Sequence, residues 1–221
     1  MYIVDIKEKE TYPLVDCYDN FDLLKNYAFT FNDDLKILFT GGISKNYSMN
    51  KDVLFFDVST FQFGKENIKE NNFIPRHRHG TIHICGYLYV IGGFKTLEEN
   101  DDEICNGINS IKYTNLMISW VEHICLGDKP INLIDPICYL YDLKYLICVS
   151  MYKGFNCFIL NLPTATGKNI DLVKENLFGS LQFSKRHFGI LNLGSKVMVS
   201  NHDEEKKSLD NTILDLDCCI K

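Results

Sequence analysis

The densest group of residues that could do chemistry is Arg76-His77-Arg78-His79, which is followed by His83 and Cys85. Residues 77, 79, 83 and 85 all have odd numbers, so an extended chain would project them from one face. A His-x-His pair on a strand can hold zinc or copper, and a nearby cysteine could complete the ligand set. Packing inside a sheet and contact with a ligand are the alternatives. We favour packing, with no metal and no cofactor.

The motifs of common enzymes are absent or broken. Gly167-Lys168-Asn169 is similar to the end of a phosphate-binding loop, but Leu162 replaces the required glycine and Asn169 replaces the hydroxyl residue. The sequence has no HExxH zinc motif, no GxSxG nucleophile motif and no dinucleotide fingerprint. We therefore expect a protein that is not an enzyme.

Length and composition favour a single β-rich domain. The chain has 221 residues, 46% of them hydrophobic, which is enough to bury a core without disulfides or metals. Ala28 and Ala165 are the two alanines, whereas Ile, Phe and Tyr are frequent, so strand formers outweigh the best helix former. A net charge of −6 argues against a general nucleic-acid binder, because phosphate contacts require a basic surface.

The nine cysteines include no Cys-x-x-Cys pair, and most lie in apolar, strand-like runs, which indicates reduced thiols in a core. Residues 1–10 alternate charged and apolar types, unlike a secretory signal. The sequence contains no run of about 18 apolar residues, the length that a transmembrane helix needs. We expect a cytoplasmic protein without membrane contact.

One unit recurs four times: an extended apolar segment, a polar break, and a second apolar strand that ends in small residues. The second strands start 51, 57 and 51 residues apart, at 35–42, 86–93, 143–150 and 194–201. Gly41-Gly42 and Gly92-Gly93 end the first two, where glycine permits the positive φ of a tight turn. Val149-Ser150 and Ser200-Asn201 replace these pairs in the last two units.

A third strand follows in each unit, at 53–58, 110–114, 157–162 and 212–216. In two units an aromatic residue lies seven positions beyond another, Phe56 to Phe63 and Tyr113 to Trp120, and we expect these rings to fill the space between units. Arg78-His79 and Arg186-His187 precede the first strand in two units. Their side chains are expected to donate to unpaired carbonyls of neighbouring loops, a structural role.

Together these features resemble the kelch repeat, in which about 50 residues form one four-stranded antiparallel blade of a β-propeller. The resemblance extends from about Tyr27 to Leu216 and is most specific in the second unit. It implies an all-β domain, 1–221, of about four blades, which acts as a scaffold for a protein partner. The blades are predicted at 27–78, 79–135 and 136–186, with partial blades at 1–26 and 187–221.

Other interpretations stay open beside the scaffold. The spacing could arise in another antiparallel β fold. The resemblance also allows a propeller that binds copper, iron or zinc, an enzyme subunit, or the propeller part of an RNA-modifying methyltransferase assembly.

In a four-stranded antiparallel blade, the loop that enters the first strand and the loop that leaves the second lie on the same side. On that side this chain collects charged loops, including an acidic stretch that lengthens the second unit. The candidate partner-binding residues are Arg76, His77, Glu98, Glu99, Asp101, Asp102, Glu103 and His202. Taken singly, each charged run is also typical of a solvated loop.

The two ends of the sequence predict an incomplete propeller. Residues 2–6 and 11–16 resemble the third and fourth strands of a blade, and the last unit ends in a third strand at 212–216, so one third-type strand is left over. Kelch-type rings usually have more than four blades. We therefore expect an open arc, a truncated chain, or self-association through unpaired edges. The alternative is a closed ring in which Thr11–Asp16 pairs beside Thr212–Leu216.

Overall fold

The computed structural model contains β-strands and one short 3-10 helix, η2 (Asp101–Glu103), and no α-helix within the described residues. The described residues are 2–5, 10–13, 24–66, 68–70, 73–112, 118–123, 125–170, 188–192, 196–203 and 208–215. For this part of the chain the prediction of an all-β fold is confirmed.

Three antiparallel meanders form the centre of the molecule. The first sheet consists of β3 (Ala28–Phe31), β4 (Lys36–Thr40), β5 (Val53–Asp57) and β6 (Gln62–Lys65). The second consists of β8 (Gly80–Ile84), β9 (Tyr87–Ile91), β10 (Ile108–Lys112) and β11 (Ile118–His123). The third consists of β13 (Ile137–Tyr141), β14 (Tyr145–Ser150), β15 (Asn156–Asn161) and β16 (Thr166–Ile170). The predicted second strands are present as β4, β9 and β14, and the predicted third strands as β5, β10 and β15, with β10 shifted along the chain.

Two short strands connect neighbouring sheets. After the first sheet, β7 (Ile68–Glu70) pairs in parallel with β11 of the second, and after the second sheet, β12 (Leu126–Gly127) pairs in parallel with β16 of the third. Each connection therefore hydrogen-bonds to the outer edge of the sheet that follows it. Sequence patterns did not predict these strands, because two or three residues are too few to show alternation.

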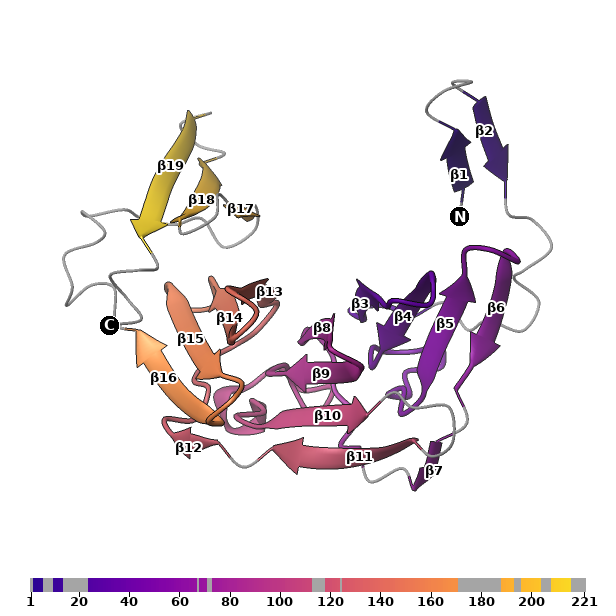
Figure 1. Cartoon of the computed structure of the whole chain (residues 1–221), viewed down its shortest axis with the longest axis horizontal. Coiled ribbons are helices and arrows are strands. Elements are labelled where there is room, and N and C mark those ends of the chain that lie inside the picture. Colours follow the sequence, from indigo (N-terminus) through magenta and orange to yellow (C-terminus); the bar gives the residue numbers. More distant parts are fainter. Residues whose placement is uncertain are drawn as a thin grey trace.

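The remaining strands lie toward the chain ends. A hairpin is formed by β1 (Tyr2–Asp5) and β2 (Glu10–Pro13), and a three-stranded sheet by β17 (Phe188–Asn192), β18 (Lys196–Asp203) and β19 (Ser208–Asp215). Figure 1 shows the three larger sheets along an arc, with the hairpin beyond one end and the three-stranded sheet beyond the other. The inner strands β3, β8 and β13 lie next to one another along this arc.

Within the described residues, β2 pairs with β1, and β19 pairs with β18. The ladder between Thr11–Asp16 and Thr212–Leu216 that a closed ring would need includes residues outside this part of the chain. The open or incomplete ring therefore stays a prediction.

The structure shifts two of the predicted positions. The third strand of the second unit begins at Ile108, two residues earlier than predicted. Phe63 lies opposite Phe56, and Trp120 lies opposite Ile111. Tyr113 itself lies outside the described residues. In the third unit, Val149 lies opposite Ile137, the first residue of β13, as Thr40 in the first unit lies opposite Ala28, the first residue of β3. Ser150-Met151 therefore stands in place of the glycine pair.

Apolar side chains fill the seam between the first and second sheets. Leu38 and Val53 of the first sheet pack with Leu88 and Trp120 of the second. The Trp120 ring also stacks on Phe73, with ring centroids 4.3 Å apart. Fully burying each such side chain contributes roughly 1.5–3 kcal/mol, so this seam joins the two sheets into one core.

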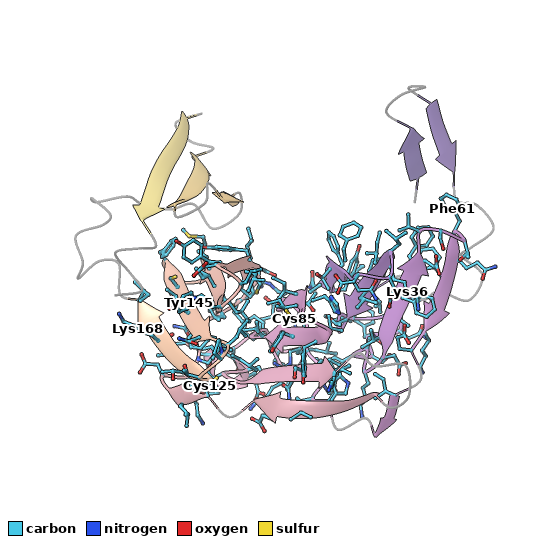
Figure 2. The ribbon with its side chains drawn as sticks, viewed as in Figure 1. Lys36, Phe61, Cys85, Cys125, Tyr145 and Lys168 are labelled. Atoms are coloured by element: carbon cyan, nitrogen blue, oxygen red, sulfur yellow. The ribbon has the colours of Figure 1, made fainter. Side chains whose placement is uncertain are left out.

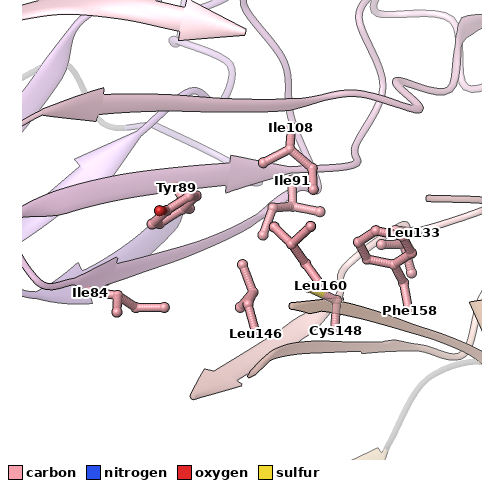
Figure 3. Close-up of a cluster of buried hydrophobic side chains, with 9 residues drawn as sticks. All are labelled: Ile84, Tyr89, Ile91, Ile108, Leu133, Leu146, Cys148, Phe158 and Leu160. Carbon is pink, nitrogen blue, oxygen red and sulfur yellow. The ribbon is translucent and has the colours of Figure 1, made fainter. Parts of the chain in front are cut away.

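The seam between the second and third sheets is built in the same way. Tyr89 and Ile91 of the second sheet face Leu146 and Phe158 of the third, and Leu133 covers the end of the cluster (Figure 3). Side chains fill the spaces between all three sheets (Figure 2). The three meanders thus form one continuous packed body.

Candidate functional site

The loops at one end of the three sheets form a single surface, which we call the loop face. It consists of the lead-in segments 24–27, 76–79 and 133–136 and the loops 41–52, 92–107 and 151–155. In the first two sheets the lead-in segment pairs with the loop of its own unit through backbone bonds: Lys25 with Ile43 and His77 with Phe94. The predicted meeting of these two kinds of loop is therefore present in the structure.

The double glycines let each lead-in segment pass close to the preceding sheet. Gly42 N donates to Arg76 O and Gly93 N donates to Leu133 O, both at 2.9 Å. A Cβ atom on Gly41 would lie 2.2 Å from Arg76 O, and one on Gly92 would lie 2.1 Å from Leu133 O. Both glycines also have positive φ, +54° and +68°. No other residue fits this approach without moving the backbone.

A second chain of backbone bonds runs from sheet to sheet through the lead-in segments. Arg78 N donates to Asn26 O at 2.9 Å, and Asp135 N donates to Arg78 O at 2.7 Å. The three residues occupy the same place in their units, and all three have a left-handed backbone, with φ of 54°, 55° and 49°. Asn and Asp tolerate this conformation well, but nothing in the sequence marks Arg78 as left-handed.

In the third sheet a hydroxyl group replaces the direct pairing of lead-in and loop. Ser150 Oγ donates to Ile134 O and accepts a bond from Ile134 N at 3.2 Å. Tyr152 N donates to the same hydroxyl at 3.3 Å. Ser150 thus connects the lead-in segment to the loop after β14.

Arg76 is a structural residue, which corrects its prediction as a partner contact. The residue is 1% exposed. Nη1 donates to Gly92 O at 3.3 Å and to Gly107 O at 3.4 Å, and Nη2 donates to Asn109 Oδ1. Burial lowers the pKa of Arg76 from its ordinary value, and Cys105 and Glu122 nearby act against this. Surrounded by carbonyls, the guanidinium has no surface left for a partner.

His77 is also buried, so its prediction as a partner contact is corrected as well. Its residue exposure is 0%, and Nε2 donates to Thr96 O at 2.8 Å. Nδ1 lies 3.9 Å from Glu99 Oε1 and makes no hydrogen bond within the described residues. His77 therefore supports the acidic loop through its hydrogen bond to Thr96.

Arg78 rather than Arg76 reaches the loop face, and its side chain donates to carboxylates instead of the loop carbonyls that the sequence predicted. Its side chain is 27% exposed, and it pairs with Asp135 Oδ2 at 2.7 Å and with Glu99 Oε2. Burial alone would lower the pKa of Arg78, but the two carboxylates raise it above its ordinary value. The side chain therefore links the acidic loop of the second unit to the lead-in segment of the third.

The acidic stretch 98–103 is anchored at several points. Asp101 pairs with Lys153 of the third unit and accepts a bond from Tyr152 Oη at 3.3 Å, and Glu103 lies 3.6 Å from Lys95 Nζ. Below it, Phe94, Ile104 and Ile134 form a small apolar cluster. Glu98 and Asp102 are exposed, and neither takes part in an ion pair that the described residues show.

His79 lies inside the seam between the first two sheets. Its Nε2 lies 2.8 Å from Thr40 Oγ1, and the ring packs against Gly41. Burial, together with the positive charge of Arg76, lowers the pKa of His79 to about 3 from the usual 6.5. The imidazole is therefore neutral at physiological pH.

The four odd-numbered residues do not line one strand face. β8 begins at Gly80, and the left-handed Arg78 interrupts the alternation, so His77 and His79 lie in the lead-in segment. His83 lies on β8 with Nδ1 3.9 Å from Asp33 Oδ2, and Cys85 lies in the turn that follows. Within the described residues, no group of three or more His, Cys, Asp or Glu side chains could hold a metal ion.

The remaining predicted residues belong to the ends of the chain or to the core. Arg186 and His187 lie outside the described residues, and His202 lies in β18 with its side chain outside the description. Trp120 packs between the first and second sheets, as described above. No helix in the described part of the chain is long and apolar enough to span a membrane.

No protein-family model matches this chain, and no curated protein matches it.

The contrast between the two arginines gives a stability prediction. Arg76→Ala removes a buried guanidinium and leaves Asn109 Oδ1 and two carbonyls unpaired, so the free energy of unfolding should fall by roughly 3–5 kcal/mol. Arg78→Ala removes a partly exposed ion pair and should cost about 1 kcal/mol or less. Urea unfolding of both variants measures the difference. Equal losses, or a larger loss for Arg78→Ala, would show that the burial assignment is wrong.

The low pKa of His79 predicts that stability depends on pH. Because an unfolded His binds a proton near pH 6.5 and the folded His79 does so only near 3, the unfolded state binds more protons between these values. Stability should therefore fall as pH drops below 6.5, by about 2 kcal/mol from this group at pH 5 relative to pH 7. His83, whose pKa is also lowered, mainly by burial, acts in the same direction.

Comparing wild type with His79→Gln isolates the contribution of His79. Urea unfolding at pH 7 and pH 5 should show a smaller loss in the variant, because glutamine takes up no proton. The same loss in both proteins would contradict the assignment of a buried, neutral His79.

Proposed function

We propose that the chain is a kelch-type β-propeller scaffold that binds a protein partner through the loop face and catalyses no reaction. The propeller is supported by three successive four-stranded meanders whose inner strands β3, β8 and β13 lie side by side. It is further supported by the glycine pairs at the end of β4 and β9, each receiving the next lead-in segment. Blades that follow one another around inner strands are the arrangement of a propeller.

Partner binding is supported by the way the acidic stretch is held. Glu99, Asp101 and Glu103 are engaged in ion pairs that anchor it, whereas the exposed Glu98 and Asp102 take part in none that the described residues show. An anchored loop loses little conformational entropy when a partner binds, so more of the contact energy appears as affinity. We therefore assign Glu98 and Asp102 to the contact with a basic patch on the partner. Loops on a rigid β scaffold are a common place for such a site.

A matched pair of charge variants tests this assignment. Glu98→Gln with Asp102→Asn removes two negative charges from the exposed part of the stretch and leaves the anchoring pairs intact. The control, Asp34→Asn with Asp142→Asn, removes the same charge from the turns at the opposite end of the sheets. Each tagged protein is cross-linked in its native cell extract, purified, and analysed by mass spectrometry at low and high salt.

Proteins retained by both wild type and the control should be reduced roughly tenfold with the loop variant, a change of about 1.4 kcal/mol. The difference should shrink at high salt, because salt screens charge attraction between exposed groups. Equal retention by all three proteins, or an equal reduction with the control, would place the partner site elsewhere.

A further inference from the structure

Two cysteines face each other across neighbouring strands of the third sheet. Cys138 in β13 lies directly opposite Cys148 in β14, and their Sγ atoms are 3.6 Å apart. The strands carry paired residues on both sides of this position, from Ile137 opposite Val149 to Tyr141 opposite Tyr145. The sulfurs are thus already in contact on a backbone whose register is fixed.

The two thiols differ in access. Cys148 is fully buried and packs in the seam cluster with Leu146 and Phe158. Cys138 is only partly buried. Its Sγ borders β8, the inner strand of the second sheet, because a Cβ atom placed on Gly80 would lie 2.6 Å from this sulfur. An oxidant can therefore reach Cys138 before it reaches Cys148.

We propose that Cys138 and Cys148 form a redox-sensitive dithiol that hydrogen peroxide converts into a cross-strand disulfide. In the first step the Cys138 thiolate attacks one oxygen of the peroxide, an S–O bond forms, the O–O bond breaks and water is released after protonation. In the second step the Cys148 sulfur attacks the Cys138 sulfenic acid, an S–S bond forms, the S–O bond breaks and a second water leaves. Two thiols are oxidised and one peroxide is reduced to two waters.

The surroundings of the two thiols give each of them a different role in these two steps. Burial shields the Cys148 thiol from peroxide in solution, and it also raises the pKa of that thiol well above its ordinary value. Cys148 therefore reacts only after the neighbouring Cys138 sulfenic acid has formed, and its proton leaves with the displaced hydroxide as water. Disulfide formation requires the sulfurs to approach to about 2 Å, and side-chain rotation on paired strands can supply this. The bond would tie the inner strand β13 to β14.

Other thiols provide controls. Cys125 packs against the same cluster from the link after β11, and Cys85 lies exposed in the turn after β8. Figure 2 places Cys85 toward the centre of the arc and Cys125 toward its outer side. Cys157 lies opposite Val149, one position along from the pair. Peptide mapping distinguishes all of these from Cys138 and Cys148.

The test treats the intact protein with hydrogen peroxide, blocks the remaining thiols with N-ethylmaleimide and digests it with trypsin and Asp-N. Trypsin cleaves after Lys144 and Asp-N cleaves before Asp128 and Asp135, so Cys125, Cys138 and Cys148 fall in three different peptides. A disulfide between Cys138 and Cys148 leaves two of these peptides joined and lighter by two hydrogen atoms. We expect this joined species in wild type and in Cys85→Ser, and its loss on reduction. It should be absent from Cys138→Ser and Cys148→Ser. Oxidised wild type should also unfold at a higher temperature than reduced wild type, and Cys138→Ser should show no such shift.

Three outcomes would overturn the proposal. They are Cys138 joined to Cys125 instead, Cys138 oxidised to sulfinic acid with Cys148 still blocked by the reagent, and both thiols unchanged by peroxide. If Cys148→Ser fails to fold, the partly buried Cys138→Ser and the mapping of wild type decide the question on their own.

Discussion

The backbone contact between each double glycine and the next lead-in segment is the constraint on which the rest of the structure depends. Gly41 and Gly92 approach the carbonyls of Arg76 and Leu133 so closely that a Cβ atom could not fit. The neighbouring Gly42 and Gly93 then donate to the same carbonyls. Because these bonds join main chain to main chain, they fix the distance and angle between successive sheets independently of side-chain packing.

Several features follow from that placement. Once a lead-in segment is held against the preceding sheet, its next residues turn into the left-handed conformation, and Arg78 and Asp135 bond from sheet to sheet. The backbone of this lead-in segment buries Arg76 and leaves Arg78 partly exposed, because the left-handed residue reverses the alternation of an extended chain. The positions of the charged groups on the loop face thus depend on the backbone contacts between the sheets beneath them. The aromatic and aliphatic cores between the sheets fill the space that the seam defines.

The sequence predicted the class of fold and the position of the second and third strands, because apolar alternation and the spacing of glycine pairs are strong local signals. It did not predict which arginine would be buried. Arg76 and Arg78 have the same parity, and only the positive φ of Arg78 separates them. The start of the third strand in the second unit was misplaced by two residues, because loop lengths shift spacing without changing composition. The links β7 and β12 were missed because they are too short to carry a pattern.

Comparing two glycine substitutions tests the central role of the seam most directly. Gly92→Ala places a methyl group against Leu133 O, whereas Gly154→Ala also meets a positive φ, of +121°, but has no atom within 4 Å of the new Cβ. Both variants carry backbone strain, so the difference between them isolates the close approach. Urea unfolding should show that Gly92→Ala loses about 2 kcal/mol more than Gly154→Ala. Equal losses would contradict the claim that this backbone contact holds the sheets together.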